Sequence, residues 1–257
     1  MTPAPGASRA VLTLAGLAAA LAVAIVAGVA FGAVQVAPGD VVSAVVRALA
    51  GHREGLADAL IIDLRLPRVL LAALVGGSLA LAGVLYQALF KNPLADPYIL
   101  GVSSGAGLGA TLALSALGTG YVARAVGVPI GAFLGAALTM VLVVRLASRR
   151  GRLDPTSLLL SGIAVSYTLS ALTSFVLVFD RESMTSVVFW MMGGLQNRSW
   201  EHVGMLAVMF AVGAVVPVLY HRELDLMLLG DERAGQLGVS VERFKMLALG
   251  SASLVVA

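Results

Sequence analysis

The stretch Asn92–Gly107 reads NPLADPYILGVSSGAG and lies where one long apolar run, 69–90, ends and another, 99–118, begins. Pro93 and Pro97 each prevent a helix from continuing and push the residue before them toward extended geometry. The small residues that follow let another helix backbone approach closely. We therefore predict a break between two helices and then a tightly packed helix. The residues of this helix-break and packing motif are Asn92, Pro93, Asp96, Pro97, Gly101, Ser104 and Gly105.

The composition around this stretch predicts an integral membrane protein. The chain is 59% hydrophobic and 12% charged, whereas a soluble domain carries roughly 25% charged residues. A bilayer crossing needs about 20 apolar residues as a helix, and a seventh such run starts near 244. The other six are 10–34, 69–90, 99–118, 126–147, 157–179 and 203–220. Because strand-like alternation is weak, we predict an all-α polytopic membrane protein.

The runs after the first carry almost no ionisable side chains. Ion-coupled carriers usually keep such a group at depth, so a secondary transporter is the less favoured alternative. The chain has no cysteine and three histidines, which disfavours disulfides and a His/Cys metal site. It also lacks the G-x-x-x-x-G-K-[ST] loop, so we predict that it does not bind ATP itself. The scattered basic residues argue against nucleic acid.

The basic residues of the loops indicate the orientation. With the amino terminus inside, ten Lys and Arg lie in inner segments and seven in outer ones, and the SRRGR cluster at 148–152 occupies a short inner loop. We read the first run as an uncleaved span rather than a signal peptide. Because LALGSASLVVA supplies about half a spanning length, we expect a longer native chain.

The segment 64–107, which runs from LRLPR through NPLADP to GVSSGAG, closely resembles the signature of FecCD-type permeases. These are ABC importer subunits for iron-siderophores, haem and vitamin B12. The resemblance continues through LLLSGIAVS (158–166), FWMMGGL (189–195) and LLGDERAGQLGV (228–239). It implies the ten-helix permease fold of type II ABC importers, with about six and a half helices in this chain. The whole chain, 1–257, would be one transmembrane domain.

The resemblance also implies a function. The expected protein imports a metal chelate by alternating access, with an iron-siderophore as the first choice and haem or vitamin B12 next. Its expected partners are cytoplasmic ABC ATPase subunits that hold ATP and Mg, an extracytoplasmic binding protein, and a second or homologous permease. The expected location is the bacterial cytoplasmic membrane, and no cofactor is expected on this chain. The remaining alternative is a truncated, non-transporting remnant.

Three groups of residues carry this expectation. Arg65 and Arg68 resemble the arginines that receive carboxylates of the binding protein, although membrane anchoring is the simpler interpretation. The segment 223–243 resembles the cytoplasmic loop that couples to the ATPase, and the alternative is an amphipathic connector. Pro155, Thr156 and Ser157 are either a helix start or a candidate inner gate. The coupling positions are Leu224, Leu228, Gly230, Ala234, Leu237 and Gly238.

Overall fold

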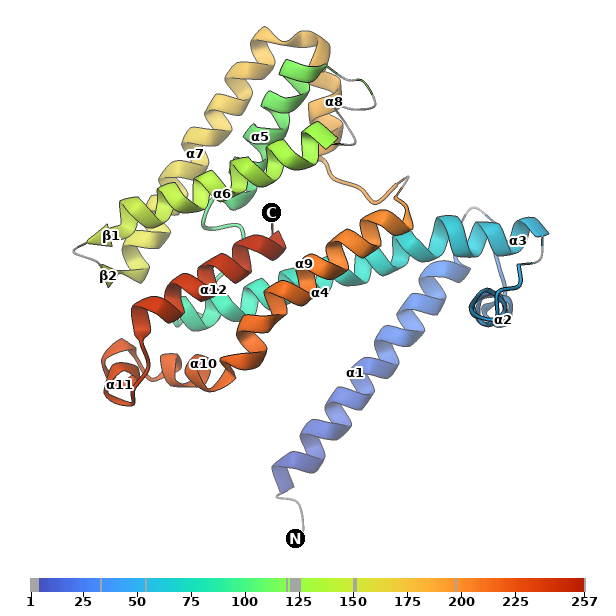
Figure 1. The fold of residues 1–257 in the computed structure, drawn as a ribbon, viewed down its shortest axis with the longest axis horizontal. Helices are drawn as coiled ribbons and strands as arrows, with labels where there is room; N and C mark the ends of the chain where they lie inside the picture. The colour runs from blue at the N-terminus through green and yellow to red at the C-terminus, as the bar shows by residue number, and fades with distance from the viewer. Residues whose placement is uncertain are drawn as a thin grey trace. The chain divides into compact units, whose positions relative to one another are not determined.

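The structure, a computed structural model, describes residues 5–32, 34–53, 55–118, 120, 126–149, 152–196 and 198–256. The chain divides into two compact units. Figure 1 shows its helices and strands, coloured from the N-terminus to the C-terminus. The first unit contains Met1–Val75 and Leu195–Ala207. The second contains Gly76–Gly194 and Val208–Ala257. Arg150 and Arg124 lie outside the described residues. The orientation prediction counted Arg150 among the inner basic residues and Arg124 among the outer ones.

The described chain is almost entirely helical. Two short strands, β1 (Ser148–Arg149) and β2 (Arg152–Leu153), pair antiparallel. The helices are α1 (Pro5–Ala30), α2 (Pro38–Leu49), α3 (Gly55–Ala59), the π-helix η1 (Leu60–Arg65), α4 (Leu66–Phe90), α5 (Val102–Leu117), α6 (Val128–Ala147), α7 (Pro155–Phe179), α8 (Arg181–Met191), α9 (Trp200–Leu219), α10 (His221–Leu228), α11 (Asp231–Gln236) and α12 (Val241–Val256).

All seven apolar runs predicted from the sequence are helices. Among the described residues, five helices are long and apolar enough to cross a membrane, and one of them runs without interruption from Gly55 to Phe90. The helices α5 and α12 are shorter, with 16 residues each. The all-α, multi-pass prediction is therefore confirmed, whereas α2, α8 and the strand pair were not predicted.

The first unit is organised around a small apolar cluster that α2 completes. Pro38 opens this helix, and its apolar side packs against the end of α1 and against η1. Arg47 of α2 donates two hydrogen bonds to the buried carboxylate of Asp58, at 3.0 and 2.5 Å. The buried members of the cluster are Val29, Ala30, Val41, Ala44, Ile61 and Ile62. The segment between the first two predicted runs is therefore folded and not a simple loop.

In the second unit, α5 and α6 touch through their backbones. A Cβ at Gly131 would lie 2.6 Å from the carbonyl oxygen of Gly109, and a Cβ at Gly105 would lie 2.6 Å from that of Gly135. Contacts this short leave no room for a side chain. Small residues repeat at four-residue spacing on both helices, the pattern that allows close helix packing in membranes. Gly105 and Gly109 of α5 therefore face a matching pair of glycines, Gly131 and Gly135, on α6.

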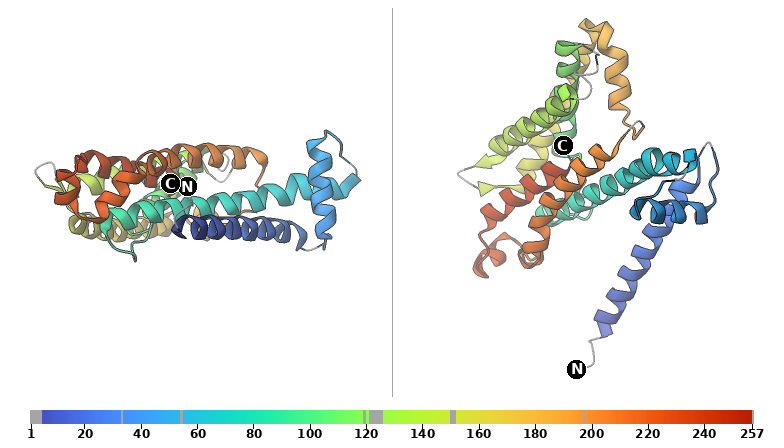
Figure 2. Two further views of the ribbon diagram at one scale, coloured as in Figure 1. Left: turned by 90° about the horizontal axis from the view of Figure 1, so that it is seen from below. Right: turned by 45° about the vertical axis from the view of Figure 1, so that its right-hand side comes forward.

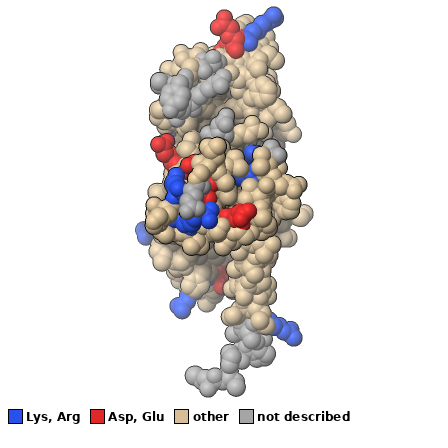
Figure 3. All heavy atoms as spheres, turned by 90° about the vertical axis from the view of Figure 1, so that its right-hand side faces the viewer, with Lys and Arg blue, Asp and Glu red and all other residues tan. Residues whose placement is uncertain are grey.

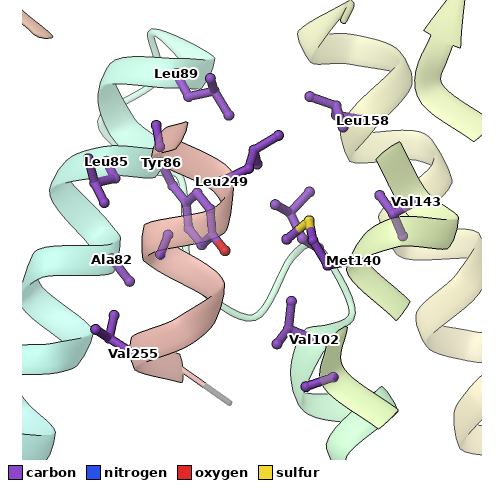
Figure 4. Packing of buried hydrophobic residues seen from close by; sticks show 14 of the residues in the cluster. Ala82, Leu85, Tyr86, Leu89, Val102, Met140, Val143, Leu158, Leu249 and Val255 are labelled. Atoms are coloured by element: carbon purple, nitrogen blue, oxygen red, sulfur yellow. The ribbon is translucent and has the colours of Figure 1, made fainter. Parts of the chain in front are cut away.

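The core of the second unit joins α4 and α12 to the α5–α7 group. Figure 4 shows Tyr86 and Leu249 between α4 and α12, with Met140 and Val102 on the facing helices. The helices α9 and α12 lie side by side in both views of Figure 2, and Ser251 donates a hydrogen bond of 2.6 Å to the carbonyl of Gly213. These contacts hold α12 against α4 and α9.

The exterior is apolar along the long helices. Large side chains such as Leu138 and Leu160 are 69% and 64% exposed. On the face shown in Figure 3, charged side chains gather in small groups and most of the surface carries none. A surface of this kind suits contact with lipid rather than with water.

Candidate functional site

The connection between α4 and α5, residues 91–101, is held by the polar residues that precede the prolines. The Asn92 side-chain oxygen accepts a hydrogen bond of 2.9 Å from the backbone N–H of Leu94. The Asp96 carboxylate accepts one of 2.7 Å from the N–H of Tyr98. Each is a local turn in which the side chain replaces a backbone acceptor. The helix break expected around Pro93 and Pro97 is thus two such turns in succession.

The end of this connection packs directly on α7. Gly101 has a positive φ of 75°, and a Cβ there would lie 2.7 Å from the hydroxyl of Ser166. A Cβ at Gly162 would lie 2.6 Å from the carbonyl oxygen of Ile99. Glycine is therefore required at 101 for its backbone conformation and at both positions for space. The structure assigns the motif a packing role between α5, α6 and α7.

The helices α10 and α11 form a compact pair joined at Gly230, whose φ is 107°. Leu224 and Ala234 face the interior and are buried. Three leucines remain outside: Leu228, Leu229 and Leu237 are 58%, 52% and 60% exposed. The predicted coupling positions therefore separate into two that hold the pair in place and others that face outward. Leu229 is an additional exposed apolar residue that the sequence analysis did not select.

The helix pair is anchored by an ion network centred on Asp231, the first residue of α11. One carboxylate oxygen of Asp231 accepts a 2.6 Å hydrogen bond from Lys91 and the other accepts one of 2.6 Å from Lys245. Lys245 also donates to the carbonyl of Leu153 at 2.7 Å. Glu242 accepts a hydrogen bond of 2.8 Å from the N–H of Leu153. We refer to these five residues as the Asp231 network.

The charges of this network perturb the Asp231 carboxyl. Partial burial by itself would raise the pKa of Asp231, but the hydrogen bonds and charges of Lys245 and Lys91 outweigh it and hold the pKa below its ordinary value. Asp231 is therefore ionised at neutral pH. A cavity of about 710 Å³ opens beside the network, and its lining includes Arg152, Asp154 and Arg243.

The sequence analysis did not identify the network. Lys91 and Asp231 are 140 positions apart, and Lys245 lies 92 positions from Leu153. None of Lys91, Asp231 and Lys245 was predicted as a site residue. A charged residue in the first turns of an otherwise apolar helix, as Lys245 is, was the available signal.

The start of α7 lies beside this network. The Asp154 carboxylate accepts a hydrogen bond of 2.7 Å from the backbone N–H of Ser157, and Pro155 occupies the first helical turn. This is a regular helix start, with an aspartate cap and a proline in the place that suits it. Thr156 is exposed. The arrangement supports the structural interpretation of these three residues, and the inner gate stays a prediction.

In the first unit, Arg65 is engaged with the end of α1. Its guanidinium donates hydrogen bonds to the carbonyls of Val29 at 2.8 Å and Ala30 at 3.3 Å, and also to that of Val34. The carbonyls of Val29 and Ala30 lie in the last turn of α1 and have no partner within the helix, so Arg65 caps α1. Arg68 is exposed, and both arginines line a cavity of about 890 Å³. Arg65 thus has a structural contact with the end of α1, and docking of a binding protein at Arg65 and Arg68 stays a prediction.

Among the residues that the structure describes, no group of three or more His, Asp or Glu side chains is arranged to hold a metal ion.

These features define a multi-pass helical membrane protein with a short, anchored helix pair between two of its spans. Residues 20–257 match the FecCD transport family, so the chain belongs to this family. The family and the multi-pass fold predicted from the sequence are therefore confirmed.

Three proteins illustrate the similarity. The cobalamin import system permease protein BtuC of Halobacterium salinarum is 40% identical over 201 residues, which cover 78% of this chain and 53% of that protein. The Fe(3+)-citrate import system permease protein YfmE of Bacillus subtilis is 34% identical over 244 residues, 95% of this chain and 71% of that protein. The Fe(3+) dicitrate transport system permease protein FecD of Escherichia coli is 35% identical over 192 residues, which cover 74% of this chain and 58% of that protein.

A solved structure shows the same fold. It is described as a metal-chelate type ABC transporter in an inward-facing conformation, with a TM-score of 0.80 and 28% identity, and the match covers 95% of this chain and 73% of that one. The present chain spans little more than half the length of several of the curated relatives that it matches, including 53% of the cobalamin permease.

Proposed function

We propose that this chain is the membrane-spanning subunit of an ATP-driven importer and that α10 and α11 form its contact with a cytoplasmic ABC ATPase. The observation that carries this proposal is the anchored helix pair. Its inner face, including Leu224 and Ala234, is buried, while Leu228 and Leu237 remain exposed. A rigid element with an apolar outer face suits a partner that must both grip and move it.

The cargo proposed for the importer is a metal chelate. Relatives are named for Fe(3+)-citrate and for cobalamin, so an iron chelate of the siderophore or citrate type is our first choice, with haem and cobalamin next. The long apolar runs after the first offer almost no ionisable side chain that would bind a free ion. An uncharged path suits a chelate that an extracytoplasmic binding protein selects.

The proposed cycle is alternating access in a bacterial cytoplasmic membrane, with the amino terminus inside. The loaded binding protein docks near Arg68, whose surroundings Arg65 shapes by capping α1. ATP and Mg act at the ATPase, and this chain binds no cofactor of its own. A second permease copy or a homologous permease completes the pathway. Residues 1–257 act as one transmembrane domain, and residues 223–243 act as its coupling loop.

The test is Leu237→Glu in the transporter purified from its own membrane in mild detergent. A buried carboxylate in an apolar contact is strongly unfavourable, so co-purifying ATPase should fall at least about tenfold, equivalent to about 1.4 kcal/mol. Gly230→Trp, which introduces a bulky side chain at a positive φ, should act in the same direction. The matched control is Leu56→Glu, because Leu56 is 91% exposed and lies in the first unit.

Uptake distinguishes the importer from the alternatives. With radiolabelled ferric citrate and cobalamin as probes, proteoliposomes that hold the permease and its ATPase, supplied with the extracytoplasmic binding protein, should accumulate at least one of them only when Mg-ATP is present. Uptake that follows an ion gradient without ATP would instead identify a secondary transporter. ATPase association without uptake of any chelate would identify a non-transporting protein. Unchanged ATPase association in both Leu237→Glu and Gly230→Trp would refute the coupling assignment.

A further inference from the structure

Lys245 is an unusual residue for its position. It lies in the second turn of the apolar helix α12, and its side chain is 1% exposed. Its ammonium group contacts the carboxylate of Asp231 at 2.6 Å, the carbonyl of Leu153 at 2.7 Å and the carboxylate of Glu242 at 3.6 Å. A buried ammonium is strongly unfavourable unless its hydrogen bonds are satisfied, and here three acceptors surround it.

The network connects the helix pair α10–α11 to two other helices. Lys91, which contacts Asp231, is the residue that immediately follows α4. Leu153, which Lys245 and Glu242 hold through its carbonyl and its N–H, lies two residues before α7. A displacement of Asp231 must therefore either carry the end of α4 and the start of α7 with it or break hydrogen bonds at a buried charge.

The two oxygens of the Asp231 carboxylate are shared between two lysines from different segments. Each oxygen receives one ammonium at 2.6 Å. The carboxylate cannot follow one lysine without changing its hydrogen bond to the other, because both ammonium groups contact the same side chain. A shared ion of this kind has discrete bonded arrangements, which is the property that lets a local shift be transmitted instead of absorbed.

We propose that Lys91, Asp231 and Lys245 are positioning residues that transmit movement of α10–α11 to the end of α4 and the start of α7. This inference rests on the proposed function, because it takes the ATPase to be what moves the helix pair. The residues do not touch the cargo or ATP. They act by keeping the moving loop and the two spans mechanically connected.

The experiment follows each end of the connection with a reporter. Residues 1–257 contain no cysteine, so a single Leu94→Cys reports on the residues after α4, and a single Arg152→Cys reports on the residues before α7. Both side chains are exposed. The assembled transporter, with its ATPase subunits, is labelled with a water-soluble maleimide, first without nucleotide and then trapped with Mg-ATP and orthovanadate.

With the network intact, we expect the labelling rates at both reporters to differ by at least about fivefold between the two states, the lower range of typical coupling between sites. In Asp231→Asn and in Lys245→Met the difference should fall below about twofold, while the ATPase still co-purifies and still hydrolyses ATP. Lys91→Arg keeps the charge and should retain the difference. The matched control is Arg243→Met, an exposed cation on the same helix as Lys245.

The outcomes separate the two proposals. If no ATPase co-purifies with the chain that carries only a reporter, the proposed function fails. If the ATPase binds and hydrolyses ATP but the difference persists in Asp231→Asn, the network does not transmit the movement and this inference is overturned. A reporter chain with no difference between the states overturns it as well. Should Lys245→Met fail to fold, Asp231→Asn and Lys91→Met decide the question, because neither side chain is fully buried.

Discussion

The helix pairs α5–α6 and α10–α11 are held by opposite kinds of contact. The first pair meets through glycine backbones, with no room for a single added carbon at Gly131 or Gly105. The second is fixed by an ion network that joins residues from four segments of the chain around Asp231. Backbone packing has one arrangement and resists any change, whereas ion pairs can re-form after a displacement. The pair α10–α11 is therefore the one that is suited to move.

The largest expected effect is on the rigid pair. In Gly109→Leu the new side chain would overlap the backbone of Gly131, so α5 and α6 must separate. We expect a loss of more than about 4 kcal/mol and little folded protein. The measurement is the monodisperse fraction in size-exclusion chromatography after extraction. The control is Gly76→Leu, because a Cβ at Gly76 has nothing within 4 Å. Equal yields for the two variants would contradict the account of this interface.

A smaller effect is expected in the ionic pair. Lys245→Met removes the buried ammonium but leaves Asp231 with Lys91, so we predict a loss of about 2–3 kcal/mol, somewhat below the cost of breaking an isolated buried pair. Thermal unfolding in detergent measures it. Arg243→Met, which removes an exposed charge from the same helix, should cost less than about 0.5 kcal/mol. A stability loss in Arg243→Met as large as that in Lys245→Met would show that the buried ammonium of Lys245 stabilises the fold no more than an exposed charge does.

The same reasoning applies to the two arginines of the first unit. Arg65→Met removes the cap from the end of α1 and should cost about 1–3 kcal/mol, because charged hydrogen bonds to carbonyls are lost. Arg68→Met should leave thermal stability nearly unchanged. For docking, Arg68→Glu should weaken binding of the extracytoplasmic binding protein at unchanged membrane insertion. If Arg65→Met were as stable as the parent, its capping role would be wrong.

The smallest effect concerns pH. The pKa of Asp231 is lower in the folded protein than its ordinary value of 3.8, so ionised Asp231 stabilises the fold above that value. This contribution is lost as the pH falls through the lowered pKa. The difference in melting temperature between the parent and Asp231→Asn should therefore be constant from neutral pH down to about pH 5 and shrink only in stronger acid. A difference that already disappears near pH 6 would argue against the lowered pKa.

Local signals in the sequence were sufficient for much of the fold. Apolar length predicted seven helices, and the prolines at 93 and 97 predicted the break between α4 and α5. Gly230 and Gly238, which were predicted as coupling positions, both have a positive φ, and Gly230 separates α10 from α11. The helix α2 was missed because its 12 residues are too few for a span and lie in a segment read as a connection.

The candidate site was harder to predict from the sequence, because its contacts join distant parts of the chain. Arg65 was predicted as a docking residue, which stays a prediction, and its capping contacts were missed because the carbonyls it binds lie 31 to 36 positions earlier. Leu224 and Leu228 were both predicted as coupling positions, yet Leu224 is buried and Leu228 is exposed. Periodicity gives the spacing of residues along a helix, but which side is covered depends on neighbours that only the folded chain brings together.

The central claim is that α10–α11 contacts an ABC ATPase, and the most direct measurement is site-specific photo-crosslinking in the native membrane. A photoreactive phenylalanine analogue would replace Leu237, and Leu56 would serve as the control position, since both leucines are exposed. We predict that position 237 crosslinks to an ATPase subunit, identified by mass spectrometry, and that position 56 does not. Crosslinks from position 237 to lipid alone would contradict the account.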